Sequence, residues 1–154
     1  MRYYGDRLKY IREEHDLSQY EISELLGFKK RVYGNFEREE TIIPLKHLNF
    51  LCNYFNVSLD YIFGFSNEKK YKNMKEEVNT NLIRERLRKL REEHNLTQKD
   101  LAKILHVSPS AISEYERKAK LIATPFLYDI CKKYHISADY LLGKIHKPQY
   151  YKNE

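Results

Sequence analysis

The chain contains the same segment twice. The residues from Asp6 to Gly64 align with those from Glu85 to Gly143 at a constant offset of 79, without a gap, and 18 of the 59 aligned pairs are identical. Chance would leave only a handful of identities, so the chain consists of two copies of one small domain. Each copy must therefore fold around a modest core of its own.

The apolar residues of each copy recur at the spacing of a helix. In the second copy, Thr97 precedes such a stretch and Asp100 follows three residues later, which is typical of a helix start, and Ser108 with Pro109 marks the next one. These signals predict helices over 82–94, 97–105, 108–117, 124–134 and 137–142, with the helices of the first copy 79 residues earlier. No segment alternates as a half-buried strand does, so the predicted fold class is all-α, with five helices in each copy.

The connection between the second and third helices is short in both copies, around Gly27 and His106. This spacing is typical of a helix-turn-helix, whose second helix can enter the major groove of DNA. The predicted organisation is a first helix-turn-helix domain over 1–65, a linker over 66–80, a second domain over 81–143 and a basic tail over 144–154. The polar linker fits both a flexible tether and a partly helical spacer.

Charge is distributed unequally between the copies. The whole chain carries a net charge of +6, which favours a polyanionic partner. Residues 1–64 contribute −1, residues 65–84 contribute +2 and residues 85–154 contribute +5. The second copy is therefore expected to provide most of the attraction to phosphate.

The sequence contains none of the patterns that indicate catalysis, a cofactor or a membrane anchor. Cys52 and Cys131 fall on apolar helix positions and are expected to be buried free thiols, and no Cys/His cluster has metal-ligand spacing. The five glycines form no phosphate-binding loop. No apolar run is long enough to span a bilayer, and the charged N-terminus is unlike a secretory signal. We therefore expect a cytoplasmic protein that is not an enzyme and has no metal, cofactor or membrane partner.

The second copy reads RLRKLREEHNLTQKDLAKILHVSPSAISEYER and closes with ISADYLLG. These residues resemble the Xre-type helix-turn-helix family, the lambda-repressor-like DNA-binding domains, and the resemblance extends over both copies. It implies two tandem five-helix lambda-repressor-like domains. It also implies a sequence-specific transcriptional regulator, a repressor in particular, whose partner is a double-stranded DNA operator.

The resemblance implies roles for individual positions. Gln19 and Gln98 begin the second helices and would bond the DNA backbone or a flanking base. The third helices would read bases, since Arg and Lys suit guanine edges and Asn suits adenine. Their outward positions are Lys29, Lys30, Arg31, Asn35 and Arg38 in the first copy and Ser108, Pro109, Ser110, Ser113, Glu114 and Arg117 in the second, and Lys118 and Lys120 lie just beyond, where they would contact phosphates.

Two pairs match the partly buried ion pair of the family, which ties the first helix to the third. They are Arg12 with Glu37 and Arg91 with Glu116. We expect a structural role for both pairs, because a buried charge that loses its partner costs roughly 3–5 kcal/mol. They are not interpreted as a catalytic acid and base.

The first copy departs from the family pattern around its third helix. Gly34 lowers helix propensity by about 1 kcal/mol, and Tyr33 replaces a family-like isoleucine. Glu39, with Glu40 beside it, replaces Lys118, and acid at this place is expected to weaken the hold on DNA. DNA binding is therefore expected mainly of the second copy, although the first copy offers the better base-reading side chains.

A second interpretation stays open. In it the chain is an antitoxin-like or protein-interaction module whose first copy binds a protein partner or a second copy of itself. The near-neutral charge of the first copy and the tyrosines expected at its surface, Tyr10, Tyr20 and Tyr33, motivate this interpretation. In the DNA-binding interpretation, covalent linkage makes the two copies a built-in pseudo-dimer on half-sites, in inverted or direct orientation.

Overall fold

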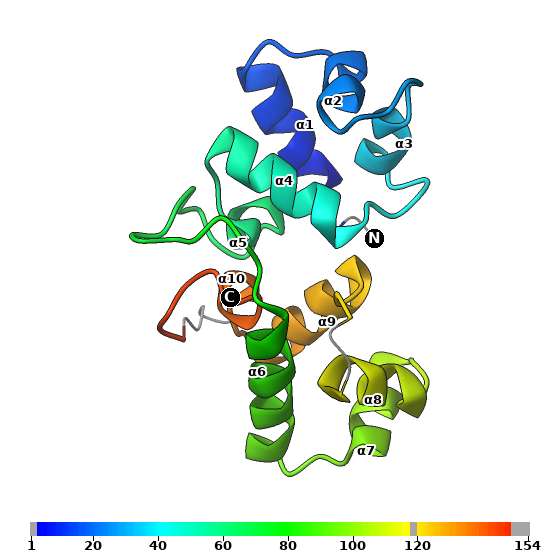
Figure 1. Ribbon diagram of the computed structural model, residues 1–154, viewed down its shortest axis with the longest axis vertical. Coiled ribbons are helices and arrows are strands. Elements are labelled where there is room, and N and C mark those ends of the chain that lie inside the picture. Colours follow the sequence, from blue (N-terminus) through cyan, green and yellow to red (C-terminus); the bar gives the residue numbers. More distant parts are fainter. Residues whose placement is uncertain (1–2, 118–119, 149–154) are drawn as a thin grey trace. The chain divides into compact units, whose positions relative to one another are not determined.

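The computed structural model describes residues 3–117 and 120–148 and divides into two compact units, residues 1–72 and 73–154 (Figure 1). Within the described ranges, every regular element along the chain is a helix. The predicted all-α fold class is therefore confirmed.

The described part of the first unit contains five helices. They are α1 (Gly5–Glu14), α2 (Gln19–Leu25), α3 (Tyr33–Glu37), α4 (Leu45–Phe55) and α5 (Leu59–Ile62). Both α1 and α2 pack against α3, and α5 packs against α1 and α4. Leu8 on α1, Ile22 on α2 and Leu48 on α4 are fully buried and belong to the core of this unit.

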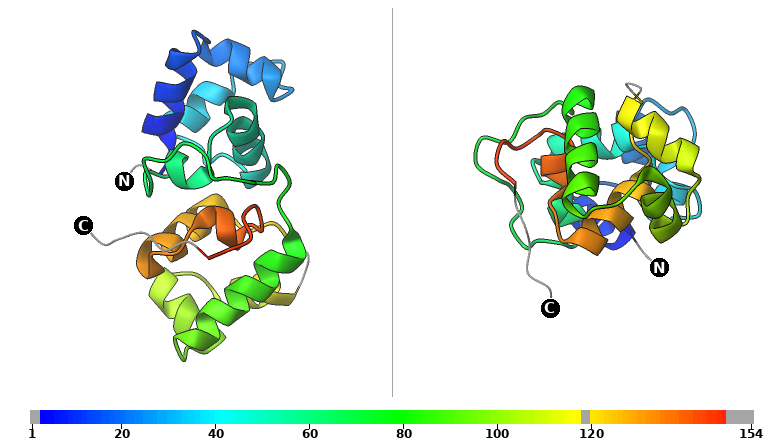
Figure 2. Two further views of the ribbon diagram at one scale, coloured as in Figure 1. Left: turned by 90° about the vertical axis from the view of Figure 1, so that its left-hand side faces the viewer. Right: turned by 90° about the horizontal axis from the view of Figure 1, so that it is seen from below.

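The second unit repeats these elements 79 residues later. They are α6 (Thr80–Glu93), α7 (Gln98–Leu105), α8 (Pro109–Arg117), α9 (Thr124–Tyr134) and α10 (Ala138–Leu141). α8 packs against α6 and α7, and α10 packs against α6 and α9 (Figure 2). The core uses the equivalent positions Leu87, Leu101 and Leu127.

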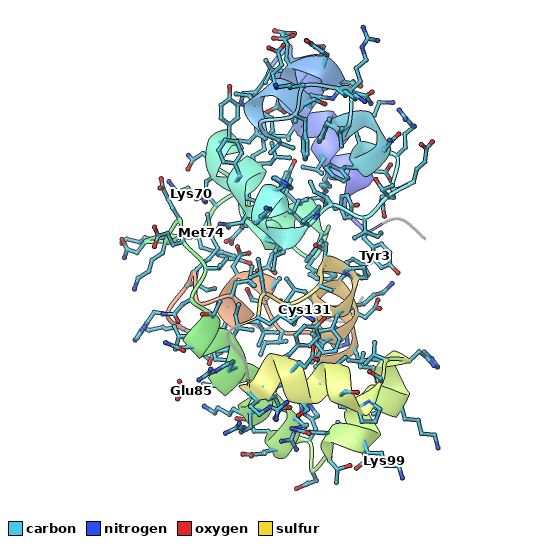
Figure 3. The ribbon with its side chains drawn as sticks, turned by 45° about the vertical axis from the view of Figure 1, so that its right-hand side comes forward. Tyr3, Lys70, Met74, Glu85, Lys99 and Cys131 are labelled. Carbon is cyan, nitrogen blue, oxygen red and sulfur yellow. The ribbon has the colours of Figure 1, made fainter. Side chains whose placement is uncertain are left out.

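The cysteines lie on the fourth helix of each unit. Cys52 on α4 and Cys131 on α9 are both buried and free, as the sequence predicts, and Cys131 is labelled in Figure 3. Each fills an apolar helix position as a small hydrophobic side chain.

The predicted helix starts are confirmed by capping contacts. The side chains of Ser18 and Thr97 each accept a hydrogen bond from the amide three residues later, and the acidic side chain at that position bonds back to the cap amide. The hydroxyl of Ser108 accepts the amide of Ala111 at 3.2 Å. Each cap satisfies donors that the first turn of a helix leaves without a partner.

The third helix of the first unit is shorter than predicted. The sequence predicts a helix over 29–38, but α3 spans only Tyr33–Glu37. The first unit has lysines at the places of Ser108 and Pro109, so it lacks both start signals. The helix starts instead where the amide of Tyr33 donates to the hydroxyl of Ser23 at 2.9 Å.

The segment 66–80, predicted as a linker, is bonded to the unit on either side of it. The hydroxyl of Tyr71 donates to the buried carboxylate of Asp60 at 2.8 Å. In the second unit, the amide of Lys75 donates to the carbonyl of Lys144 at 2.8 Å, and Asn79 caps α6. The division between the compact units falls within this segment, after residue 72. Of the predicted basic tail, residues 149–154 lie outside the described residues.

A duplicated arginine fastens the fifth helix of each unit to the first. Arg7 on α1 donates to the carbonyl of Tyr61 at 3.0 Å, and its guanidinium lies 4.4 Å from the ring centroid of that tyrosine. Arg86 on α6 donates to the carbonyl of Tyr140 and lies 4.0 Å from its ring centroid. A cation over an aromatic ring and at the carbonyl end of a helix is stabilising in both respects.

Candidate nucleic-acid interface

Each unit connects its second and third helices by a turn of the same geometry. The turn begins with a residue of positive φ, Gly27 at 86° and His106 at 56°. In the second unit, the amide of Val107 then donates to the carbonyl of Ala102 at 3.0 Å, and the first unit has the equivalent bond at the same length. The two helix-turn-helix pairs are therefore closed by the same backbone contact.

An ion pair anchors the third helix of each unit to the first helix. Arg12 donates through Nε and Nη2 to the carboxylate of Glu37 at 2.8 and 3.1 Å. Arg91 donates in the same way to Glu116 at 2.8 and 2.9 Å. The hydrogen bonds with these glutamates raise the pKa of both arginines. Because both carboxylates are buried, the two-pronged contact fixes the orientation of the third helix.

The two glutamines that begin α2 and α7 lie on these ion pairs. Nε2 of Gln19 donates to Glu37 at 2.6 Å, and Nε2 of Gln98 donates to Glu116 at 3.4 Å. Burial opposes ionisation of Glu37, but hydrogen bonds from Arg12 and Gln19 outweigh it, so its pKa lies below the usual value. The expected contact of the glutamines with the DNA backbone stays a prediction.

The first unit adds a tyrosine to this network. The hydroxyl of Tyr33 donates to Glu37 at 3.1 Å, and the ring is fully buried. Burial, reinforced by the charge of Glu37, raises the pKa of Tyr33 well above its usual value. The prediction of a surface Tyr33 is therefore wrong, whereas Tyr10 and Tyr20 are exposed.

Gly34 on α3 has a packing role. A Cβ at this position would lie 2.8 Å from Oε1 of Gln19 and 2.9 Å from Nη1 of Arg38. The missing side chain therefore lets these two side chains approach the helix closely. This packing accompanies the low helix propensity that the sequence indicates at Gly34.

The start of α8 presents polar side chains to solvent. Ser108, Pro109 and Ser110 are exposed, while Ser113 and Glu114 are half-buried. Ile112 and Tyr115, three residues apart, are buried and hold α8 on its core, as expected of a helix with one apolar face.

The basic residues near the end of α8 differ in their contacts. Arg117 is exposed, and Lys120 donates to the carboxylate of Glu114 at 3.0 Å, which raises the pKa of the lysine. The structure therefore brings a predicted phosphate contact and a predicted base reader together. Lys118, which the sequence also places among the DNA contacts, lies outside the described residues.

Three basic candidates of the first unit lie before α3, and not on it. Lys29, Lys30 and Arg31 are exposed in the connection that leads into the helix, so the prediction of a reading helix over them is wrong. The guanidinium of Arg31 lies 5.8 Å from the ring centroid of Tyr20, within the range of a cation–π contact.

Two further candidates of the first unit bond to each other. Nη2 of Arg38 donates to the side-chain oxygen of Asn35 at 2.9 Å. Nε of the same arginine donates to Glu40 at 2.9 Å, and this bond raises the pKa of Arg38. The exposed guanidinium of Arg38 is therefore already paired with a carboxylate of its own unit.

Glu39 has a different role from the one expected. The amides of Tyr3 and Gly5 donate to its carboxylate at 2.8 and 3.0 Å, so Glu39 closes the N-terminal end of α1. A carboxylate is stabilising at that end of a helix. The sequence interpretation, which treated Glu39 only as acid near the DNA, missed this contact across the unit.

Two arginines on α6, to which the sequence assigned no role, contact the C-terminal end of α8. Arg84 donates to the carbonyl of Arg117, and Arg88 donates to the carbonyl of Glu116, both at 3.2 Å. With Lys89, and with the acidic Glu85 and Glu92, they line a groove along α6 beside the end of α8. The spacing of four residues predicts that the two arginines share one helix face. Only the packing of α8 shows that this face contacts the end of α8.

The described part of the chain contains no group of three or more His, Cys, Asp or Glu side chains arranged to hold a metal ion. Among the same residues, no helix is both long and apolar enough to cross a membrane.

Comparison with known proteins agrees with this geometry. The chain is 35% identical over 77 residues to an uncharacterised helix-turn-helix-type transcriptional regulator, YobD of Bacillus subtilis, covering 47% of this chain and 69% of that protein. It is 37% identical over 59 residues to the regulator ImmR of the same species, and 30% identical over 63 residues to the antitoxin PezA of Streptococcus pneumoniae. The last two matches cover 38% and 41% of this chain, and 46% and 40% of the relatives. No solved structure matches the chain significantly.

The family comparison covers both units. A family model described as helix-turn-helix matches residues 8–62 and again residues 87–141, which together form most of the chain. Each match begins within the first helix of a unit and ends at the last residue of its fifth helix. The chain therefore belongs to the Xre-type helix-turn-helix family and carries two tandem copies of its domain.

Proposed function

We propose that the chain is a sequence-specific transcriptional regulator, in particular a repressor, that binds a double-stranded DNA operator and catalyses no reaction. The observation that carries the proposal is α8, a helix that begins with exposed polar residues and is held in place by the ion pair between Arg91 and the buried carboxylate of Glu116. A helix presented in this way fits the major groove. The relatives that are named transcriptional regulators support the same function. A regulator of this kind acts on the chromosome, so we expect the chain in the cytoplasm.

Contacts to phosphate would set the register of the second unit. Gln98 at the start of α7 and Lys120 after α8 lie on either side of the reading positions. Lys118 would add to them, and residues 85–154 together carry a charge of +5. Such contacts position the protein, while Ser110, Ser113 and Glu114 would meet base edges.

The first unit would read DNA with side chains from two places. Lys29, Lys30 and Arg31 project from the connection before α3, and Asn35 lies on the helix itself. These donors suit guanine and adenine edges. Arg38 would contribute once it exchanges Glu40 for a phosphate or a base.

The test begins with selection of binding sites from random duplexes by the whole chain. The combined substitution Gln98→Ala and Arg117→Ala should then lower affinity for the selected site about tenfold or more, since a good hydrogen-bonded pair with a base is worth about 1–3 kcal/mol. Lys133→Ala on α9 removes the same charge at an exposed position and serves as the control. Circular dichroism checks that the variants stay folded. An unchanged affinity in the double variant would show that the second unit is not the reader.

A second candidate function is association with a protein through the first unit. Phe50 and Tyr54 on α4 are 43% and 47% exposed, and their rings stack with centroids 6.4 Å apart. The second unit has Asp129 and Lys133 at the same places. A protein named as an antitoxin among the relatives is consistent with this candidate.

The repeat supplies the variant that tests this candidate. Phe50→Asp with Tyr54→Lys gives α4 the residues of α9 and should abolish any self-association that sedimentation detects in the wild type. If the wild type is monomeric at micromolar concentration, self-association is excluded and only a foreign protein partner is left for this surface.

A further inference from the structure

The two units hold their reading segments in the same way. The bidentate contact from Arg12 to Glu37 recurs as that from Arg91 to Glu116, with Nε–O distances of 2.8 Å in both. The turn before each third helix closes through the same backbone bond of 3.0 Å. Both units therefore anchor the third helix to its own domain in the same way, and what differs between them is the set of residues around that helix.

The side chains at those positions differ almost throughout. The pairs at an offset of 79 are Lys29 and Ser108, Lys30 and Pro109, Arg31 and Ser110, Gly34 and Ser113, and Asn35 and Glu114, and only Arg38 and Arg117 agree. This divergence contrasts with the residues that hold the fold, since the arginine, glutamine and glutamate of the ion-pair network are the same in both units.

The differences are differences of chemistry. The first unit offers positively charged donors at Lys30 and Arg31, which suit the O6 and N7 acceptors of guanine, and the amide of Asn35, which suits adenine. At the equivalent places the second unit offers two small residues and the carboxylate of Glu114. This carboxylate accepts from Lys120 at 3.0 Å and, being an acceptor, suits the N4 amino group of cytosine. The two sets of groups therefore favour different base pairs.

The presentation differs as well. In the second unit the reading residues from Pro109 onward belong to a helix of nine residues. In the first unit the lysines and Arg31 precede α3, which has five residues, and Arg31 lies against the ring of Tyr20. The same base step would therefore meet side chains on different backbones in the two units.

We infer that one chain recognises an asymmetric operator: a guanine-containing half-site for the first unit and a half-site of different sequence for the second. The inference rests on the proposed DNA-binding function. A homodimer of identical domains reads a palindrome because its two reading helices are identical. In this chain two domains of one fold are covalently linked and their reading side chains have diverged, so a palindrome would satisfy at most one unit.

The test uses site selection with the whole chain and with one variant. Arg31→Ser with Asn35→Glu gives the first unit the residues of the second at two reading positions and lowers the net charge by two. Lys70→Ser with Lys72→Ser lowers it equally at exposed positions outside the interface and is the control. The wild type should select a motif of two unlike halves, occupied by one chain. The variant should bind that motif about tenfold or more weakly and reselect a site in which only one half has changed.

The possible outcomes distinguish failure of the asymmetric-operator inference from failure of the proposed DNA-binding function. A wild-type motif with two identical halves, a motif with a single half, or a variant that changes both halves or neither would overturn the inference and leave DNA binding intact. Recovery of no motif at all would overturn the proposed function itself. The control variant should reselect the wild-type motif, and a change in its motif would count against the assignment of Arg31 and Asn35.

Discussion

The carboxylate of Glu116 receives two hydrogen bonds from the guanidinium of Arg91, at 2.8 and 2.9 Å, at a place where Glu116 itself is only 2% exposed. A pair of this kind adds little net stability, because both charges lose water. Its effect is to join α8 to α6 in one orientation. The equivalent pair, Arg12 with Glu37, does the same for α3 and α1.

Removal of one partner of the Arg91–Glu116 pair should destabilise the second unit. Arg91→Ala leaves Glu116 without its main cation and should lower the free energy of unfolding by about 3 kcal/mol, the lower end of the range for a broken buried pair. Arg88→Ala is the matched control, since Arg88 is 54% exposed and its Nε lies 3.6 Å from the same carboxylate. A partner so exposed should contribute less than about 1 kcal/mol. Urea unfolding measures both, and equal losses would contradict the structural role given to Arg91.

The first unit should lose stability in mildly acidic solution through His47. Its ring lies 5.2 Å from Phe28 and 6.4 Å from Phe36, and burial, with the charge of Lys46, lowers its pKa below the usual 6.5. The folded form therefore binds a proton less readily than the unfolded form. Its contribution to stability is complete above about pH 6.5 and is lost as the pH falls from there through the lower pKa of the folded state.

The repeat again supplies the comparison for His47. The second unit has Phe126 at the equivalent position, so His47→Phe should remove this part of the pH dependence. Every other titratable residue is the same in the wild type and in this variant. Melting temperatures are measured for the wild type and the variant at pH 7.5 and pH 5.5, and the wild type should lose more on acidification. An equal loss in both would rule out a contribution from His47.

Glu39 and Glu40 are adjacent but should respond oppositely to substitution. Glu40→Ala releases Arg38 from an exposed ion pair and should raise affinity for DNA about twofold to fivefold, without loss of stability. Glu39→Ala removes the carboxylate that accepts the amides of Tyr3 and Gly5, and should cost about 1 kcal/mol of stability, as loss of an N-terminal cap does. Fluorescence anisotropy and denaturant unfolding of both variants distinguish the two roles. Equal behaviour of the two variants would show that the carboxylates share one role.

Much of the fold could be predicted because its signals are local. The caps at Ser18 and Thr97 depend on residues three positions apart, and the repeat supplied each signal twice. The predicted start of the third helix in the first unit was wrong because the signal for the true start is not local. Its start depends on Ser23, ten residues earlier on another helix, and no local pattern reports that contact.

Less of the candidate site could be predicted from the sequence, because its contacts join residues that are far apart in the chain. Tyr33 has the pattern of a surface tyrosine, yet its hydroxyl bonds to Glu37 inside the ion-pair network. Glu39 contacts Tyr3 across 36 residues, and a chain pattern shows only that an acid is present. The identity of the reading positions came from the family resemblance, and their contacts with DNA stay predictions.

The most direct test of the account is the ratio of two affinities measured at one salt concentration. The whole chain is titrated onto its selected duplex and onto a shuffled duplex of the same length and composition. A sequence-specific regulator should bind the selected duplex at least about a thousandfold more tightly than the shuffled one. Equal affinity for the two duplexes would contradict sequence-specific recognition.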